Sequence, residues 1–403
     1  MKKRNLLILF VALAILIIPL IIRETNNNQI NQGLTLEELR SLPYLTHTRE
    51  KADETKKGVV KYDQELAFEG YNLVGPNLMD MEGNMVHSWS NPNSSFGVFG
   101  VILNNGNFLI SNLRETSIAK YSWDSNIIWE EEVINHHEIT ISLNNTILIP
   151  SKEMHEYNGR KVEFDLIIEL SQEGEEISRW STYENFDYIK KFHEPSELDL
   201  LAYVHIPAEK DPTNVSLLVG GDFDYYHLNS IQVLPETPIG KKDYRFQAGN
   251  WLLSFCHVSL VVILDKETKK VVWSWGPGEL DLQHSPIMLD NGNILIYDNG
   301  FNREYTRVIE LDPIKKEIIW EYKEYSPELF FSQSQGYAQR LPNENTLITD
   351  SESGRAFEVT KNGTIVWEWF NPEINEEGKR ITVYRMVRYP KDKIDKLLEL
   401  NKK

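Results

Sequence analysis

The sequence predicts an all-β protein, a six-bladed β-propeller with an N-terminal transmembrane helix. Three observations support this prediction. A strand that ends in tryptophan recurs along the chain, Asn-Gly turns separate the strands between its repeats, and one long uncharged segment precedes them all. Aromatic residues make up 11% of the chain, which fits the half-buried surfaces of β-strands.

The uncharged segment predicts a membrane anchor. It covers the 17 residues Leu6–Ile22, the short end of the length that spans a bilayer, and three basic residues precede it. By the positive-inside rule the N-terminus stays in the cytoplasm, so we expect a single-pass membrane protein with an extracytoplasmic propeller. A cleaved signal peptide is the alternative, but no small-x-small cleavage site follows. We assign residues 1–23 to the anchor (a signal-anchor) and 24–60 to a linker.

The repeated tryptophan strand defines the blades. Its leading residues are Trp89, Trp129, Trp180, Trp273, Trp320 and Trp367. They are separated by 40, 51, 93, 47 and 47 residues, and a period in the forties with strands and no helices is typical of a propeller. The spacing of 93 residues exceeds one blade. We assign the excess to a loop at 181–220 and not to a seventh blade.

Asn-containing turns between apolar runs predict the hairpins inside the blades. They occur in the segments 104–111, 144–150, 291–297 and 343–349. The first blade lacks one strand, and we expect residues 381–390 to supply it, because pairing the two chain ends closes the ring and removes open sheet edges. The propeller then covers residues 61–390, and a surface helix is expected for the tail at 391–403.

The composition excludes some function classes. The formal net charge is −18, and a surface this acidic repels nucleic acid, so we expect no nucleic-acid partner. Cys256 is the only cysteine of the chain, so no internal disulfide forms.

Two histidines occupy equivalent positions in their blades. Counting back 11 residues from Leu148 in one second strand gives His137, and the same count from Leu295 gives His284. The first strand of each blade lines the channel on the propeller axis, so both side chains are expected to reach that channel.

A third histidine belongs to the same set. His227 opens the first strand of the intervening blade, and Asn229 points to the same side because strands have a period of two. The equivalent positions in two other blades are Val98 and Gly336, so the fold itself does not require histidine there.

Two chemistries suit histidines that converge on an axis. Neutral imidazoles bind zinc or iron, which would make the site a metal centre of the kind that oxygenases use. A neutral imidazole also attacks an electrophilic group while its neighbours hold the developing negative charge. Asn229 favours the second, because an amide is a good donor to an oxyanion and a poor ligand for a soft metal.

The chain resembles the arylsulfate sulfotransferase family of six-bladed propellers from about residue 70 to residue 390, and four segments carry the resemblance. They are HHEIT (136–140), HLNS (227–230), QHSPIMLDNGNILIYDNG (283–300) and AQRLPNENTLITDSESGRAFEVT (338–360). The resemblance implies transfer of a sulfuryl group from a phenolic sulfate to a phenol, without a nucleotide sulfate donor and without a cofactor or metal. It implies a ping-pong route in which His284 is sulfated, while His227, Asn229 and His137 hold sulfate oxygens and assist proton transfer.

The sequence departs from the family at one position. Where the family has an arginine after the His-x-Asn-Ser strand, this chain has Cys256, so a fixed cation is lost. Arg303, Arg355 and Arg385 follow strands or turns near blade ends and are candidates to replace it. Cys256 beside His257 is an alternative nucleophile, although adjacent residues on a strand point apart.

Two further classes of propeller compete with a sulfotransferase. Residues 261–275 resemble the repeat of quinone-dependent dehydrogenases, but those propellers usually have eight blades and repeat this signature in most of them. A non-catalytic extracellular propeller that binds ligands or proteins is the other, and the missing arginine is the observation that favours it.

Overall fold

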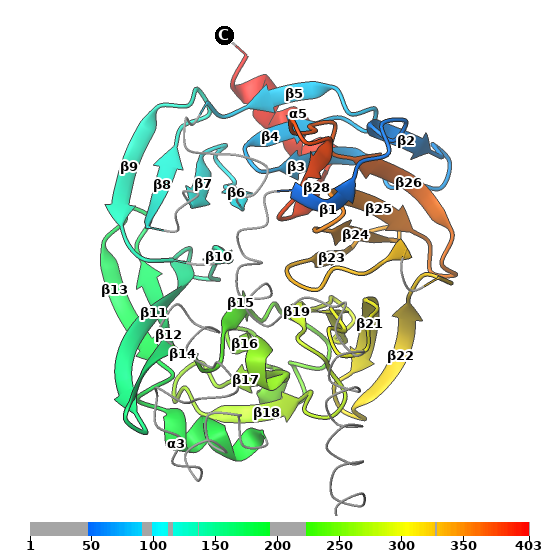
Figure 1. Cartoon of the computed structure of the whole chain (residues 1–403). Coiled ribbons are helices and arrows are strands. Elements are labelled where there is room, and N and C mark those ends of the chain that lie inside the picture. The colour runs from blue at the N-terminus through cyan, green and yellow to red at the C-terminus, as the bar shows by residue number, and fades with distance from the viewer. Residues whose placement is uncertain are drawn as a thin grey trace, which may run out of the picture.

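Six antiparallel sheets surround a central axis in the computed structural model (Figure 1). The structure describes residues 47–90, 99–111, 116–135, 137–193, 223–326 and 329–402. The predicted six-bladed all-β fold is confirmed. Within these ranges no helix is long and apolar enough to cross a membrane. The predicted anchor at 1–23 lies outside them.

Each blade has four strands, which follow one another from the axis outward. Blade 1 contains β28 (Met386–Pro390), β3 (Gly70–Val74), β4 (Asn77–Met79) and β5 (Met85–Ser88), and blade 2 contains β6 (Gly100–Ile102), β7 (Phe108–Ser111), β8 (Ser117–Tyr121) and β9 (Ile127–Glu132). Blade 3 contains β10 (Thr140–Ile141), β11 (Ile147–Tyr157), β12 (Arg160–Leu170) and β13 (Glu176–Ser181), and blade 4 contains β15 (Leu228–Val233), β16 (Trp251–Phe255), β17 (Leu260–Leu264) and β18 (Val271–Trp275). Blade 5 contains β19 (His284–Met288), β20 (Ile294–Asp298), β21 (Arg307–Asp312) and β22 (Glu317–Tyr322), and blade 6 contains β23 (Tyr337–Arg340), β24 (Thr346–Asp350), β25 (Arg355–Val359) and β26 (Ile365–Phe370).

The position of a strand in its blade explains its sequence. The middle strands are covered on both faces by neighbouring blades, so β17 (LVVIL) and β20 (ILIYD) are buried throughout. The outer strand β22 is mostly exposed. Apolar side chains from adjacent blades pack against each other, as Ile263 of blade 4 and Ile296 of blade 5 do within one cluster. The core is therefore a ring of inter-blade layers.

The ring closes in blade 1, where β28 pairs antiparallel with β3 and Val387 stands opposite Leu73. The prediction that 381–390 completes the first blade is confirmed for Met386–Pro390. A buried ion pair joins the two sides of this seam, because Arg388 of β28 reaches Glu358 of β25 in blade 6. Both side chains are 0% exposed.

The segment 24–60, predicted as a linker, contains strands in its described part. β1 (His47–Lys51) pairs with β27 (Lys379–Ile381), and β2 (Gly58–Tyr62) adds a fifth strand to blade 6 beyond β26. Val59 and Tyr62 pack against the apolar cluster between blade 6 and blade 1, so burial of their side chains accounts for the extra strand.

Two helical segments lie at the periphery. α3 (Phe186–Ile189) starts the region predicted as a loop at 181–220, of which residues 194–220 lie outside the described ranges. β14 (Phe223–Asp224) then pairs parallel with β12 and leads the chain to His227. α5 (Lys391–Leu400) directly follows β28, and its Ile394 and Leu397 pack on the cluster between blades 1 and 2.

Four of the six recurring tryptophans connect their blade to the next. The indole N–H of each donates to a backbone carbonyl in the turn between the third and fourth strands of the following blade, at 2.7–2.8 Å. The pairs are Trp129 with Gln172, Trp273 with Pro313, Trp320 with Lys361 and Trp367 with Met81. The indoles of Trp89 and Trp180 are buried without such a partner among the described residues, so the repeat in the sequence corresponds to a hydrogen bond between blades at four of its six positions.

Replacing Trp273 by phenylalanine should lower the free energy of unfolding by about 1–3 kcal/mol, because the Pro313 carbonyl loses its donor in a buried place. Trp320→Phe is the matched control. The Trp320 indole is half-exposed, so water can replace it at the Lys361 carbonyl and the loss should stay below about 1 kcal/mol. Denaturant unfolding of both variants measures the difference, and equal losses would contradict this account.

Candidate functional site

Three predicted histidines meet on the propeller axis. They stand at the starts of the inner strands of blades 3, 4 and 5: His137 just before β10, His227 directly before β15, and His284 as the first residue of β19 (Figure 1). The Nε2 atoms of His137 and His227 lie 2.9 Å apart, and the ring centres of His137 and His284 are 6.0 Å apart. The structure thus brings together the two side chains that the spacing selected and the third, His227, that was chosen because it opens the first strand of its blade.

The backbone at this site adopts conformations that side chains rarely tolerate. His137 has φ +64°, His227 has φ +55°, and Ser285, next to His284, has φ +47°. Left-handed backbone at non-glycine residues costs on the order of 1–3 kcal/mol each and concentrates at functional sites. The surrounding contacts must therefore hold these three residues in place.

Asn299 sets the tautomer of His284. The amide of Asn299 donates to the carbonyls of Ser332 and Gln335, at 2.8 and 2.7 Å, so its Oδ1 is the atom that faces His284. The Nδ1–H of His284 donates to that Oδ1 at 2.8 Å. In the neutral ring Nε2 then carries the lone pair.

The charge state of His284 follows from its surroundings. Burial is the main cause that lowers the pKa of His284 to about 3, and nearby His227 and Arg385 lower it further, so the ring is neutral at physiological pH. A neutral imidazole with an unprotonated Nε2 is a nucleophile. Asn299 belongs to the Asp-Asn-Gly end of the segment 283–300, but no pattern in the sequence indicates its role.

Asp224 fixes His227 in a similar way. His227 Nδ1 lies 2.5 Å from Asp224 Oδ2, and its backbone N–H donates to Oδ1 of the same carboxylate at 3.0 Å. Burial lowers the pKa of His227, but the charge of Asp224 and its hydrogen bond outweigh burial and leave that pKa raised. Asp224 was not predicted. An acidic residue three positions before a histidine is the signal that could have identified it.

A buried cation also lies at the axis. Arg385 forms an ion pair with Glu138 and donates to Ser285 Oγ at 2.9 Å, and it lies over the rings of Tyr337 and Phe99 at 4.0 and 4.4 Å. Its Nε has no hydrogen-bond partner among the described residues. An unsatisfied guanidinium N–H in a buried place is suited to an anionic ligand.

Arg385 is thus the one of the three candidate arginines that reaches the histidine site. Arg303 instead pairs with Asp298 at 3.1 Å, and Arg355 pairs with Glu368 at 2.6 Å. Neither of these two arginines has a hydrogen bond or an ion pair with a residue of the histidine site among the described residues.

Glu138 joins the elements of the site. In addition to Arg385, its carboxylate accepts hydrogen bonds from Ser230 Oγ and Ser285 Oγ, both at 3.1 Å. These partners follow His227 and His284 in the sequence, so one buried carboxylate ties blades 3, 4 and 5 to the segment before β28. His136, its neighbour in the HHEIT segment, lies outside the described residues.

Asn229 and Cys256 lie beside the site, and among the described residues neither side chain has a hydrogen bond to a histidine ring. Asn229 donates to the carbonyl of Gln283 at 2.8 Å, which holds the chain just before His284. Cys256 is buried, and burial raises the pKa of its thiol well above the ordinary range, which leaves no thiolate at neutral pH. These contacts make Asn229 a positioning residue and argue against Cys256 as a nucleophile.

One group of described side chains has the composition of a metal site. Ligand atoms of Asp224, His227 and His257 lie within 4.8 Å of one another. However, hydrogen bonds already engage these atoms: His227 Nδ1 faces the Asp224 carboxylate, and His257 Nδ1 lies 2.9 Å from the Asp224 carbonyl. A metal ion would have to displace both hydrogen bonds, so we assign none to this group.

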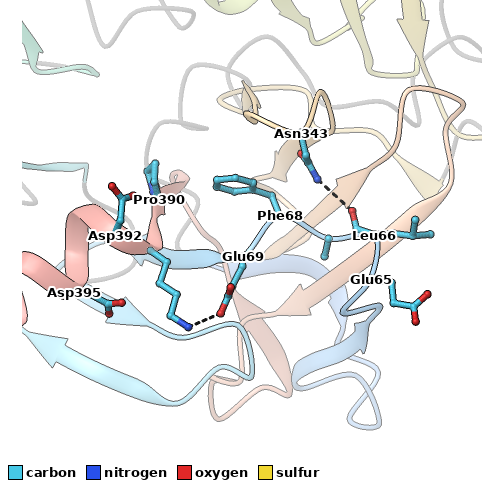
Figure 2. A pocket seen from close by; sticks show the side chains of 10 residues that line it. Glu65, Leu66, Phe68, Glu69, Asn343, Pro390, Asp392 and Asp395 are labelled. Atoms are coloured by element: carbon cyan, nitrogen blue, oxygen red, sulfur yellow. Dashed lines mark hydrogen bonds and ion pairs between the residues drawn. The ribbon is translucent and has the colours of Figure 1, made fainter.

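A separate groove of about 580 Å³ lies where α5 follows β28 (Figure 2). Glu65, Glu69, Asp392 and Asp395 give it an acidic lining, and Lys391 is paired with Glu69 at 2.5 Å. An acidic groove repels anionic ligands. The groove therefore does not compete with the axial site for such a ligand.

The fold and the site define a six-bladed β-propeller in which a neutral imidazole and a buried guanidinium share the axis. The model of one family, described as arylsulfotransferase (ASST), matches residues 81–372. The chain belongs to the arylsulfotransferase family.

Solved structures of other propellers are similar to this chain. A protein of unknown function from Bacteroides caccae is 14% identical, with 79% of this chain and 98% of that one covered and a TM-score of 0.47. A streptogramin B lyase is 10% identical, covering 85% and 96%, with a TM-score of 0.44. A catalytically inactive virginiamycin B lyase from Staphylococcus aureus with quinupristin is 11% identical, covering 79% and 88%, with a TM-score of 0.42. No curated protein matches the sequence.

Proposed function

We propose that this protein transfers a sulfuryl group from a phenolic sulfate ester to a phenolic acceptor through a sulfated His284, without a nucleotide sulfate donor. The observation that supports this most directly is the hydrogen bond from His284 Nδ1 to Asn299, which directs the unprotonated Nε2 into a site that also holds Arg385. Membership in the arylsulfotransferase family supports the same reaction class.

The reaction runs in two half-reactions. In the first, Nε2 of His284 forms a bond to sulfur as the bond from sulfur to the phenolic oxygen breaks, and a phenolate leaves. In the second, the acceptor loses its proton and its oxygen attacks the sulfur, which returns His284 to its neutral form. Sulfuryl transfer resembles phosphoryl transfer in that positioning and charge stabilisation provide most of the acceleration.

Arg385 is suited to hold the sulfate oxygens. It presents an N–H without a partner among the described residues, and it comes from the segment before β28, in a blade other than that of His284. The two ring nitrogens of His227 face His137 and Asp224, so we assign His227 to proton transfer and not to the sulfate oxygens. The transferring group is thus held from one blade while the nucleophile approaches from another.

The proposal includes the predicted location. The basic N-terminus and the uncharged segment Leu6–Ile22 would hold the chain at a membrane, with the propeller on the extracytoplasmic side. Phenolic esters and phenols present outside the cytoplasm are then its substrates.

Two measurements test the function. Purified protein incubated with 4-nitrophenyl sulfate and a phenol should release nitrophenol and form the new aryl sulfate. With the donor alone, intact-protein mass spectrometry should show the gain of one sulfonate group. A chain that binds these compounds but shows neither product nor mass change would contradict the proposal.

Replacing Arg385 by methionine should reduce the rate of sulfuryl transfer by about 10²–10³-fold, because one charged donor to the sulfate oxygens is lost. The double variant that carries both Arg385→Met and Glu138→Gln removes the partner carboxylate as well, so no unpaired charge stays buried. It should be folded but as slow as the single variant. The initial rate with 4-nitrophenyl sulfate measures both. Wild-type activity in the double variant would show that Arg385 only compensates Glu138.

Two considerations favour a second candidate function. Glu138 already neutralises Arg385, and by the resemblance to the family Cys256 stands where an arginine is expected. A propeller that binds a neutral aromatic ligand on the axis without turnover is consistent with both facts. Calorimetric titration with a phenol and with its sulfate ester separates the two, because a sulfotransferase must bind the ester.

A further inference from the structure

Four side chains form a continuous row of hydrogen bonds across the axial site. The hydroxyl of Tyr384 lies 3.1 Å from His137 Nδ1, the Nε2 atoms of His137 and His227 lie 2.9 Å apart, and His227 Nδ1 lies 2.5 Å from Asp224 Oδ2. Tyr384 is half-buried, just before β28, and Asp224 ends β14. The row therefore joins residues from three blades.

The geometry restricts where protons can reside. Two imidazole nitrogens 2.9 Å apart must share one proton, since two protons would repel and two lone pairs would make no bond. With both rings neutral, every bond in the row points the same way: Tyr384 donates to His137, His137 to His227, and His227 to Asp224. When one more proton enters at Tyr384, two hydrogen bonds change direction: His227 now donates to His137, and His137 donates to Tyr384. The added positive charge then rests on His227, beside the Asp224 carboxylate.

We propose that Tyr384, His137, His227 and Asp224 form a proton relay that stores the proton exchanged between the two half-reactions. The relay rests on the function proposed above and assigns roles to two residues, Tyr384 and Asp224, in addition to the histidines.

The proton balance of the reaction requires such a store. When the donor ester transfers its sulfuryl group to His284, a phenolate leaves, and the charged relay gives it a proton at the Tyr384 end. When the acceptor phenol attacks, it returns a proton to the relay at the same end. One proton thus cycles, and neither substrate exchanges it with solvent.

Charges around His227 favour the stored proton. Asp224 contacts the ring, Asp165 accepts the backbone N–H of Leu228 at 2.7 Å, and Glu163 lies on the same strand β12. His257 stacks on His227 with ring centres 4.7 Å apart, and His284 adds no positive charge because burial keeps it neutral. The raised pKa of His227 agrees with the charge of Asp224 beside its ring, whereas burial raises the pKa of Asp165 and of Glu163 and so reduces the negative charge that these two contribute.

The identity of the donor ester provides the test. 4-Nitrophenolate is a stable leaving group that needs no proton, whereas unsubstituted phenolate leaves much faster with one. Asp224→Asn should therefore slow single-turnover sulfation of the protein by phenyl sulfate about 10²-fold or more, and leave sulfation by 4-nitrophenyl sulfate nearly unchanged. Tyr384→Phe should give the same selective loss. Asp243→Asn, on a carboxylate paired with Arg245 far from the row, is the control and should affect neither donor.

A second readout does not depend on turnover. In protein labelled with ¹⁵N-histidine, Asp224→Asn should lower the pH at which His227 titrates, because the charge beside its ring is removed. Equal slowing of both donors, or an unchanged titration of His227, would overturn the relay and leave the transferase intact. No transfer by the wild-type protein with either donor would overturn the transferase and the relay with it.

Discussion

Replacing His284 by asparagine should abolish sulfation of the protein and reduce sulfuryl transfer by a factor on the order of 10⁶, the loss typical when a covalent nucleophile is removed. The asparagine amide can still donate a hydrogen bond to Asn299 Oδ1 but forms no stable bond to sulfur. The measurement is the mass of the protein after incubation with 4-nitrophenyl sulfate alone, together with the steady-state rate of transfer to a phenol.

The matched control is His155→Asn. His155 stacks on Tyr183 at the surface of blade 3 and pairs with Glu153, so the same exchange there should leave transfer unchanged. A sulfated His284→Asn variant would show that another residue is the nucleophile, and His137 and His227 would be the next to examine.

The largest effect on stability is expected at the junction of blade 6 and blade 1, where β28 closes the ring. Glu358→Gln leaves the buried guanidinium of Arg388 without its counter-charge, and the free energy of unfolding should fall by about 3–5 kcal/mol. The remaining contacts of Arg388, with Asn72 and the carbonyl of Phe68, supply hydrogen bonds but no negative charge. Denaturant unfolding followed by tryptophan fluorescence measures the change.

Two controls define that result. Glu176→Gln removes a carboxylate from an exposed pair with Arg179, and it should cost less than about 1 kcal/mol. Replacing Arg388 and Glu358 together by apolar residues should recover most of the stability lost in Glu358→Gln, because no unpaired charge stays buried. A Glu358→Gln variant as stable as the Glu176→Gln variant would contradict the importance of the buried pair.

The fold could be predicted from the sequence because the same residue type has the same structural role in most of the blades. Four of the six repeat tryptophans bond to the next blade in the same way, so the same residue recurs at a similar spacing. The extra strand β2 could not be predicted in this way. It pairs with β26 at the far end of the sequence, and a single added strand leaves no periodic signal.

The candidate site could likewise be predicted only where it follows the repeat. Strand register places His137, His227 and His284 at equivalent starts of inner strands; the spacing reveals this for His137 and His284, and the start of the strand reveals it for His227. The partners of these rings, Asp224 and Asn299, come from a short strand and a loop that carry no repeat. The choice of Arg385 among three arginines depended on how the segment before β28 enters the ring, which only packing between blades determines.

The order of the strands along the chain has a consequence for biosynthesis. β28 follows every other described strand in the sequence, yet it pairs with β3, and Arg385 directly precedes it. A nascent chain that has not yet released this segment holds five blades and an open gap, and long-range pairings of this kind form late. The three histidines can then be in position, but Arg385 reaches them only when β28 pairs with β3. Incomplete chains therefore lack the positive charge of the binding site. The protein becomes able to catalyse its reaction in the same step that closes the ring.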